Sequence, residues 1–205
     1  MDKGKIIDAL QAGKVKLVSQ YNRALLRAGK RLDLTGANLG WTNLGRVHLA
    51  GANLEAANLE GAGLKRANLT EANLAGANLS EVNLHAADLR KANLTEVSLL
   101  SANLEWVALG GGNLEGANLK WANLTEANLT GASLMEANLD RSSGLPRWCG
   151  SFDVKVNDEF AYDEAYHFCR LVFPKGSDGE KIQGMLKKYA NRSGLIERHG
   201  LQEIT

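Results

Sequence analysis

Residues 115–134 read EGANLKWANLTEANLTGASL and place a leucine at every fifth position, namely Leu119, Leu124, Leu129 and Leu134. In an α-helix successive residues lie about 100° apart, so a step of five turns by about 140° and scatters these leucines around the axis. In a flat strand the side chains alternate with period two, so every second leucine would point to the wrong face. The spacing therefore fits neither a helix nor a flat strand.

The same spacing continues without interruption from Leu34 to Leu139, which gives 22 leucines. The residue two positions before each leucine is alanine in 15 units and valine in four, and the residue directly before it is asparagine in 15. A small apolar residue and a leucine two positions apart point to the same side of a short extended segment, and asparagine or glycine permits a tight bend into the next segment. The alternative is a disordered low-complexity tract, and the unbroken leucine series argues against it.

Coils built in this way can stack, because their backbones pair at about 4.8 Å and their leucines bury one another. A single unit buries nothing, whereas the stack buries a continuous core. One structural ladder of the core is expected to consist of Leu54, Leu74, Leu94, Leu114 and Leu134. The sequence thus predicts an all-β solenoid.

The stretches ANLEAANLEGA, ANLTEANLAGANL and ADLRKANL resemble the A(N/D)LXX units of pentapeptide-repeat proteins, and the resemblance covers residues 32–141. It implies a right-handed quadrilateral parallel β-helix with four units per coil. Twenty-two units would then form about five and a half coils, roughly 26 Å long at the strand spacing. The handedness and the number of units per coil rest on the family alone.

Both ends of the repeat are expected to be capped by helices, since an open solenoid exposes unpaired strand edges. Residues 1–31 are expected to form an N-terminal helical cap, because apolar residues recur there at three-to-four spacing. Residues 142–205 are expected to form a C-terminal helical hairpin cap after SSGLPRWCG ends the repeat. An independent binding domain is the alternative for this last segment.

The charge is unevenly distributed although the formal net charge is only +1. Residues 1–31 hold eight Lys/Arg against two acidic residues, residues 32–141 hold seven against twelve, and residues 142–205 hold nine of each. This balance is not that of a strongly basic nucleic-acid binder, so no direct nucleic-acid binding is expected. There is neither an apolar run of about 18 residues nor a signal-peptide pattern, so we expect a cytoplasmic protein without membrane contact.

Motifs for catalysis or metal binding are scarce in the chain. It contains no G-x-x-x-x-G-K-[ST], no G-x-S-x-G and no H-E-x-x-H. His167 and Cys169 could contribute to a metal site, but residues two apart on a helix point about 200° apart and chelate poorly. We therefore expect no catalytic residue, no metal and no cofactor, with a metal-binding or catalytic C-terminal tail as the alternative.

Large apolar residues at the variable positions after the repeat leucines indicate a candidate interface. These candidates are Leu100, Trp106, Trp121 and Met135. Three alternatives remain open: a heterologous partner, a homodimer, or cover by the C-terminal hairpin. Trp41 also occupies a variable position, where the N-terminal cap could cover it.

A basic patch is expected on one side of the solenoid when the units are aligned with a period of twenty residues. Its members are Arg46, Lys65, Arg66, Arg90 and Lys91. Such a patch could orient a charged partner. An ordinary solvated surface is the alternative.

These observations predict a non-enzymatic solenoid scaffold that binds an unidentified protein partner. The family resemblance adds a second hypothesis, because quinolone-resistance members of the family bind DNA gyrase by mimicking a DNA rod. Residues 32–141 carry seven bases against twelve acids, a charge of only −5, and they include the basic patch. Leucine also occupies the central positions at which those members use many phenylalanines. Both features argue against gyrase binding, which a supercoiling assay can test.

Overall fold

Two helices open the chain in the computed structural model, which describes residues 1–144 and 155–156. Helix α1 spans Lys3–Gln11 and helix α2 spans Val15–Arg27. Asp2 caps α1, because its carboxylate accepts a hydrogen bond from the Lys5 N–H at 2.9 Å. The two helices match the helical segment expected near the N-terminus.

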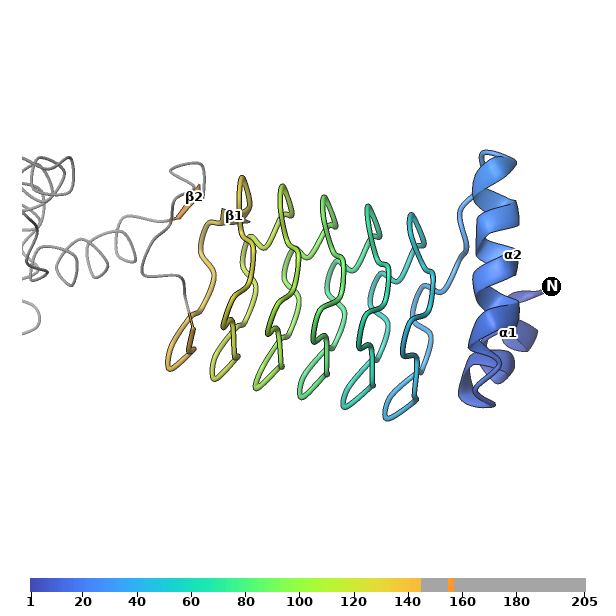
Figure 1. Ribbon diagram of the computed structural model, residues 1–205, viewed down its shortest axis with the longest axis horizontal. Helices are drawn as coiled ribbons and strands as arrows, with labels where there is room; N and C mark the ends of the chain where they lie inside the picture. Colours follow the sequence, from blue (N-terminus) through green and yellow to red (C-terminus); the bar gives the residue numbers. More distant parts are fainter. Residues whose placement is uncertain (145–154, 157–205) are drawn as a thin grey trace, which may run out of the picture. The chain divides into compact units, whose positions relative to one another are not determined.

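Stacked coils follow the helices, and every isolated parallel bridge in them joins residues twenty apart. The bridges run from Asp33–Asn53 to Asn123–Ser143. Since the sequence unit has five residues, each coil contains four units. Figure 1 shows the coils stacked along one axis, with α1 and α2 at the end where the stack begins. Two short strands are also present, β1 (Ser133–Leu134) and β2 (Lys155–Val156).

Each unit makes a tight turn directly after its leucine. In the first unit, the Ala37 N–H donates to the Leu34 carbonyl at 3.0 Å, and Gly36 between them has a φ of 62°. A positive φ at this position is typical of a type II turn, which favours glycine. Within the described part of the chain, fifteen non-glycine residues nevertheless adopt it, among them Trp41 with a φ of 58°. Hydrogen bonds between coils hold them there, since the Trp41 N–H donates to the Glu60 carbonyl at 2.7 Å.

Asparagine recurs before the leucines because its side chain makes two kinds of hydrogen bond. The Asn73 Oδ1 accepts from the Ala75 N–H at 3.3 Å, which closes the turn. The Asn73 Nδ2 donates to the Asn53 Oδ1 at 2.9 Å, and the Asn93 Nδ2 donates to the Asn73 Oδ1 at 3.0 Å. The asparagine side chain therefore stabilises both the turn and the stacking of coils. The sequence pattern predicted its role in the turn but not its role in the stacking.

The core consists of the repeat leucines and the small residues two positions before them. The ladder leucines are almost fully buried: Leu54, Leu74, Leu94 and Leu114 are 0% exposed and Leu134 is 3% exposed. Leucines on all four sides of each coil meet in the same interior. The turn residues face outward, so the core places little constraint on their side chains.

Helix α2 closes part of the first coil's free edge through polar side chains. The Asn22 Nδ2 donates to the His48 carbonyl at 3.1 Å and to the Ala50 carbonyl at 3.0 Å. The Ser19 Oγ accepts from the His48 N–H at 3.0 Å. In later coils the equivalent backbone N–H and carbonyl groups are hydrogen-bonded to the preceding coil. The first coil has no preceding coil, and the side chains of α2 supply these hydrogen bonds. Further contacts of this type, both to first-coil carbonyls, are Lys3 Nζ to Thr35 at 2.5 Å and Gln11 Nε2 to Asn38 at 2.9 Å.

The helices and coils belong to one compact unit, Met1–Lys155. The expected C-terminal helical hairpin of residues 142–205 lies almost entirely outside the described residues. Within the described part of the chain, neither helix combines the length and the apolar character that crossing a bilayer demands.

Candidate functional site

The turns align along the solenoid into four corners, each contributing two outward residues per coil. Corner 1 holds residues 35–36, 55–56, 75–76, 95–96, 115–116 and 135–136; corner 2 holds 40–41, 60–61, 80–81, 100–101, 120–121 and 140–141; corner 3 holds 45–46, 65–66, 85–86, 105–106 and 125–126; corner 4 holds 50–51, 70–71, 90–91, 110–111 and 130–131. Residues twenty apart on one corner are separated by about one strand spacing, roughly 4.8 Å. The corner and the coil together define the place of each outward residue.

The candidate interface residues lie on three of these corners. Leu100 and Trp121 share corner 2 in successive coils, where the Ser101 N–H donates to the Lys120 carbonyl at 2.9 Å. Trp106 lies on corner 3 in the same coil as Leu100, whereas Met135 lies on corner 1. The structure thus places Leu100 and Trp121 on one corner in successive coils and Trp106 on an adjacent corner, and we name these three residues the outer apolar surface. Met135 lies on the other adjacent corner, in the coil after that of Trp121.

All three residues of the outer apolar surface are accessible. Leu100 is 36% exposed, Trp106 is 57% exposed and Trp121 is 50% exposed. The Arg141 guanidinium carbon lies 4.7 Å from the centroid of the Trp121 ring, a distance typical of a cation–π contact. This contact places the guanidinium over one side of the ring.

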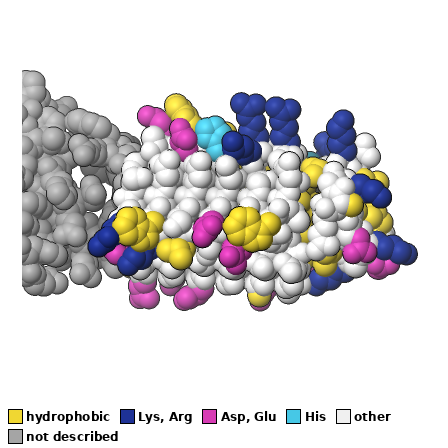
Figure 2. Space-filling view, turned by 90° about the horizontal axis from the view of Figure 1, so that it is seen from below, with side chains coloured by type: hydrophobic (Ala, Val, Ile, Leu, Met, Phe, Trp, Pro, Cys, Tyr) yellow, Lys and Arg dark blue, Asp and Glu magenta, His cyan; other side chains and the backbone are white. Residues whose placement is uncertain are grey.

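Trp41 also lies on corner 2 but belongs to the first coil. It is 71% exposed, and its ring packs against the backbone of Gly61, where any side chain would overlap it. The alternative that the N-terminal cap covers Trp41 is therefore wrong, because the ring packs toward the second coil. Figure 2 shows hydrophobic side chains on the face seen from below, with acidic side chains between them.

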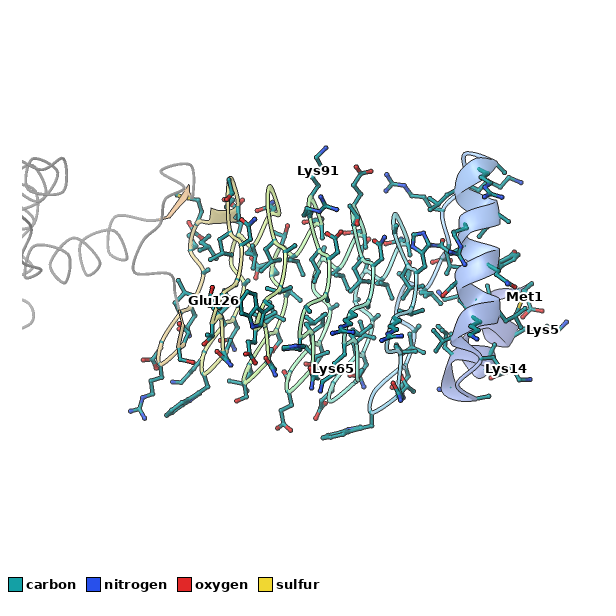
Figure 3. The ribbon with its side chains drawn as sticks, viewed as in Figure 1. Met1, Lys5, Lys14, Lys65, Lys91 and Glu126 are labelled. Carbon is teal, nitrogen blue, oxygen red and sulfur yellow. The ribbon has the colours of Figure 1, made fainter. Side chains whose placement is uncertain are left out.

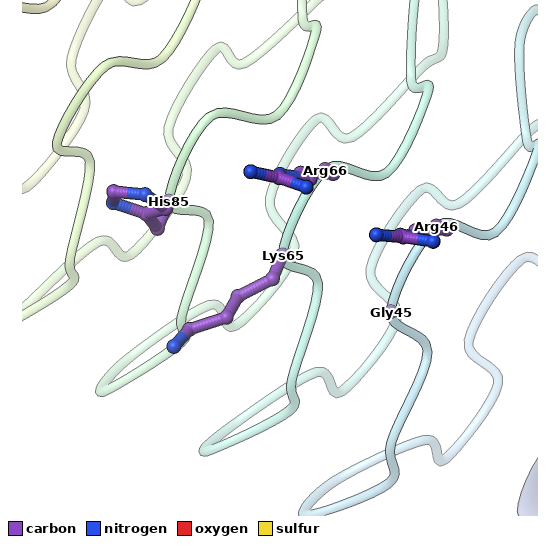
Figure 4. A pocket seen from close by; sticks show the side chains of 5 residues that line it. All are labelled: Gly45, Arg46, Lys65, Arg66 and His85. Carbon is purple, nitrogen blue, oxygen red and sulfur yellow. The ribbon is translucent and has the colours of Figure 1, made fainter.

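Three of the five expected basic residues gather on corner 3. Arg46, Lys65 and Arg66, together with Gly45 and His85, line a hollow of about 420 Å³. Arg46 and Arg66 occupy the same turn position in successive coils, and their side chains run side by side (Figure 4). His85 faces Glu105, with 3.5 Å between Nδ1 and Oε2. Among the residues that the structure describes, no acidic side chain lines this hollow.

The other two expected basic residues, Arg90 and Lys91, lie on corner 4. Lys91 points away from the side on which Lys65 lies (Figure 3). The Arg90 guanidinium donates to both carboxylate oxygens of Asp88, at 2.9 and 2.7 Å. These hydrogen bonds lower the pKa of Asp88 and raise the pKa of Arg90. Because its charge is compensated locally, Arg90 contributes little to a basic surface.

A second hollow, of about 940 Å³, lies between α2 and the first coil. Its lining residues are Gly13, Lys14, Val15, Lys16, Leu17, Ser19, Gln20, Arg23, Asn43, Gly45, Arg46 and His48. It shares the lining residues Gly45 and Arg46 with the hollow on corner 3, so the two hollows adjoin there. Sequence reasoning did not identify Lys14, Lys16 and Arg23 as site residues. The signal that could have found them is the excess of six positive charges in residues 1–31.

His48 lies at the junction of α2 and the first coil. Burial lowers the pKa of its imidazole from the ordinary value of 6.5, and the nearby positive charge of Arg23 lowers this pKa further. The His48 Nδ1 is buried and has no hydrogen-bond partner among the described residues. Protonating this ring would place a charge in a site that disfavours it.

We expect the stability of the wild-type protein to fall between pH 7.5 and pH 5.5 more steeply than that of a His48→Asn variant. Near pH 6 the unfolded chain binds more protons than the folded protein, because the folded-state pKa of His48 is lowered. Stability is therefore present above about pH 6.5 and is lost as the pH falls toward the lowered pKa. Asparagine is the usual residue at this repeat position, so the variant should keep the fold.

Urea midpoints measured at several pH values for both proteins test this expectation. Aspartates titrate at lower pH, so they contribute little in this window. Parallel pH profiles for the two proteins would contradict it.

Metal chemistry receives no support from the described part of the molecule. Within residues 1–144 and 155–156, no three His, Cys, Asp or Glu side chains are grouped so as to hold a metal ion. The residues of the metal-binding alternative, His167 and Cys169, lie outside these ranges.

Residues 33–70, 64–99 and 102–141 match the family model described as pentapeptide repeats, in eight copies. The matched segments together cover more than half of the chain. With the twenty-residue bridges, this match confirms the fold class that the resemblance implied, a right-handed quadrilateral parallel β-helix. No curated protein matches the chain at a significant level.

Solved structures of pentapeptide repeat proteins are similar to the chain. HetL, involved in heterocyst differentiation regulation in the cyanobacterium Nostoc sp. strain PCC 7120, is 34% identical over 60% of this chain and 59% of HetL, with a TM-score of 0.34. A protein from the Arabidopsis thaliana thylakoid lumen is 26% identical over 75% of this chain and 88% of its own, with a TM-score of 0.38. Full-length QnrB1, a plasmid-mediated fluoroquinolone resistance protein, is 16% identical over 69% of this chain and 75% of QnrB1, with a TM-score of 0.43. This chain thus spans less than two thirds of HetL.

Proposed function

Because this chain belongs to the pentapeptide-repeat family, we propose that it is a non-enzymatic scaffold that binds a protein partner through the side of its solenoid. The observation that carries the proposal is the outer apolar surface. A leucine and two tryptophans are exposed there on neighbouring corners of successive coils.

The burial of the core and the exposure of the turns support this proposal. The repeat leucines already fill the interior, so the fold gives no reason for tryptophan at an outward turn position. Tryptophan is enriched among the residues that contribute most to protein–protein binding energy, and it contributes a large apolar area. At positions 106 and 121 the chain holds tryptophan with a positive φ, 59° and 62°, although the turn favours glycine there.

The rigidity of the scaffold also supports binding. The Trp106 N–H donates to the Thr125 carbonyl at 2.9 Å, and the Trp121 N–H donates to the Asp140 carbonyl at 3.0 Å. Both tryptophans are therefore fixed to the next coil by their own backbone. A partner would meet a backbone already ordered at both positions, so the entropy lost on binding would be mainly that of the side chains.

Affinity capture from a native lysate, with three purified proteins as bait, tests the proposal. The baits are the wild type, a Leu100→Ala/Trp106→Ala/Trp121→Ala variant and a Trp41→Ala variant. We expect a protein that the wild type and the Trp41→Ala variant retain and that the triple variant loses, because the triple variant removes the central apolar contacts. Circular dichroism establishes first that all three baits are folded.

The Trp41→Ala variant is the matched control. Trp41 lies on corner 2, as Trp121 does, and is more exposed, but it lies in the first coil. Identical capture by all three baits, or capture by none, would contradict the proposed role of the outer apolar surface. Light scattering of the same samples measures the molar mass of each bait and so distinguishes a homodimer from binding to another protein. The homodimer alternative predicts a dimeric wild type and a monomeric triple variant.

The gyrase hypothesis receives less support from the charge distribution. A DNA mimic needs a strongly negative surface, whereas Arg46, Lys65 and Arg66 line a hollow on corner 3 of this solenoid. Inhibition of gyrase supercoiling, or protection of gyrase from a quinolone, at micromolar protein would restore this hypothesis. We expect neither effect.

We also propose a cytoplasmic location for this function. The chain has only two cysteines, Cys149 and Cys169, which fits a reducing compartment. Fractionation of cells that express a tagged chain tests the location.

A further inference from the structure

The free edge of the first coil is closed unevenly by the N-terminal helices. Their side chains bond to first-coil groups at Thr35, Asn38, His48 and Ala50. Between these positions, among the described residues, no hydrogen bond reaches the carbonyls of Asn43 and Gly45 or the N–H of Asn43. One side of the coil therefore retains an open strand edge.

The later coils show what this edge can bind. One coil further on, the Gly63 N–H donates to the Thr42 carbonyl at 2.9 Å, and the Gly63 carbonyl accepts from the Leu44 N–H at 2.8 Å. The Lys65 carbonyl likewise accepts from the Arg46 N–H at 2.9 Å. In the first coil, the equivalent donor and acceptors at positions 43 and 45 have no preceding coil. An extended peptide could satisfy all three groups in the same pattern.

This open edge lies in the larger hollow, between α2 and the first coil. The lining of this hollow and that of the hollow on corner 3 are both strongly basic. The cations that line the two adjoining hollows are Lys14, Lys16, Arg23, Arg46, Lys65 and Arg66, and among the described residues no acidic side chain lines either hollow. Within the described residues, none of these six forms a salt bridge. We name the two hollows together the basic groove.

We propose that the basic groove binds an extended acidic segment of a partner protein, which adds a strand to the open edge at Asn43–Gly45. Backbone hydrogen bonds to the edge fix the direction of the segment. Carboxylates on the segment pair with the cations of α2 and of corner 3. Arg46 is central, because it lines both hollows.

An acidic peptide fits the groove better than a nucleic acid does. Both ligands supply negative charge, but the open edge presents two carbonyl acceptors as well as one N–H donor. A peptide backbone supplies N–H groups for those carbonyls, whereas a phosphodiester is only an acceptor. A helical ligand is also a poorer fit, because the backbone N–H groups in the middle of a helix are already paired.

This inference goes beyond the proposed function, since it concerns a different surface and a different chemistry. The outer apolar surface lies in the fourth and fifth coils, whereas the basic groove lies at the first three coils and α2. Substitutions in one surface should leave binding at the other unchanged.

Fluorescence anisotropy with a labelled eight-residue peptide of alternating glutamate and valine, blocked at both ends, tests the proposal on the full chain. We expect saturable binding that rising salt weakens. An Arg46→Glu variant should bind this peptide about tenfold more weakly, because it reverses the charge that both hollows share. The same peptide N-methylated at every second residue should also bind about tenfold more weakly, because it cannot pair fully with the edge.

The matched control is Lys91→Glu. Arg46 and Lys91 are both exposed at the same turn position, with φ angles of 59° and 57°, but Lys91 lies on corner 4. This control should change peptide binding by less than about twofold. The Leu100→Ala/Trp106→Ala/Trp121→Ala variant should bind the peptide as the wild type does, so the two proposals can fail separately.

Four outcomes would overturn the inference. The first is no saturable binding of the acidic peptide, and the second is equal loss in Arg46→Glu and Lys91→Glu. The third is undiminished binding of the N-methylated peptide, which would exclude strand addition. The fourth is tighter binding of a twelve-nucleotide oligo-dT than of the peptide, which would identify the groove as a nucleic-acid surface. Slower amide exchange at Asn43 in the complex would support strand addition directly.

Discussion

Replacing Leu84 with alanine is expected to lower the free energy of unfolding by about 2–5 kcal/mol, the range that leucine-to-alanine changes show in other protein cores. Leu84 is fully buried in the middle of the stack, between the equivalent leucines Leu64 and Leu104. The coil cannot collapse around the cavity without breaking its hydrogen bonds to both neighbours. Urea denaturation measures the loss.

Leu100→Ala is the control for this expectation, because it makes the same chemical change at an outward turn position. Leu100 is 36% exposed, so we expect a loss below about 1 kcal/mol. Similar losses for Leu84→Ala and Leu100→Ala would contradict the assignment of inward and outward leucines.

Replacing Asn22 with alanine is expected to destabilise the protein by about 1–3 kcal/mol, because it leaves two partly buried backbone acceptors unpaired. Asn22 is fully buried, and its Nδ2 donates hydrogen bonds to the carbonyls of His48 and Ala50. Denaturation measures the total effect. Amide exchange shows whether the first coil opens before the others.

Gln20→Ala is the control on the same helix, since Gln20 is exposed. It should change stability by less than about 0.5 kcal/mol. If Asn22→Ala were equally mild, the side-chain cap would not contribute to the stability of the first coil.

The interior of the solenoid could be predicted from the sequence because each interior position repeats. A leucine at every fifth residue excluded a regular helix and a flat strand. The small residue two positions before each leucine indicated that both side chains point into the core. The need for a bend after each leucine was also evident, and the structure assigns it to asparagine side chains such as Asn73. The number of units per coil came from the family resemblance, since five-residue spacing alone does not fix it.

The surfaces were harder to predict because they depend on side chains that do not repeat. A period of twenty placed Arg90 near the basic patch, but its pairing with Asp88 depends on a side-chain rotamer. The contribution of Arg23 to the basic groove could not be foreseen, because it depends on how α2 packs against the first coil. Trp41 could equally have lain under the cap until its packing against Gly61 was known.

The separation of interior from corners explains how such a chain can acquire binding surfaces. The leucines and alanines hold the coils, so a turn residue can change without altering the core. The two surfaces described above use that freedom at different ends of the same stack. One is apolar and the other is basic.

Binding through the outer apolar surface is tested most directly by calorimetric titration of the purified captured protein. The titration is made against the wild type and the Leu100→Ala/Trp106→Ala/Trp121→Ala and Trp41→Ala variants. Loss of the outer apolar surface is expected to raise the Kd by about thirtyfold or more, which corresponds to a loss of at least about 2 kcal/mol of binding free energy. Trp41→Ala should change the Kd by less than about threefold, and wild-type binding should show the negative heat-capacity change of apolar burial. Equal affinity for the wild type and the triple variant would contradict binding through the outer apolar surface, because the partner would then bind elsewhere on the molecule.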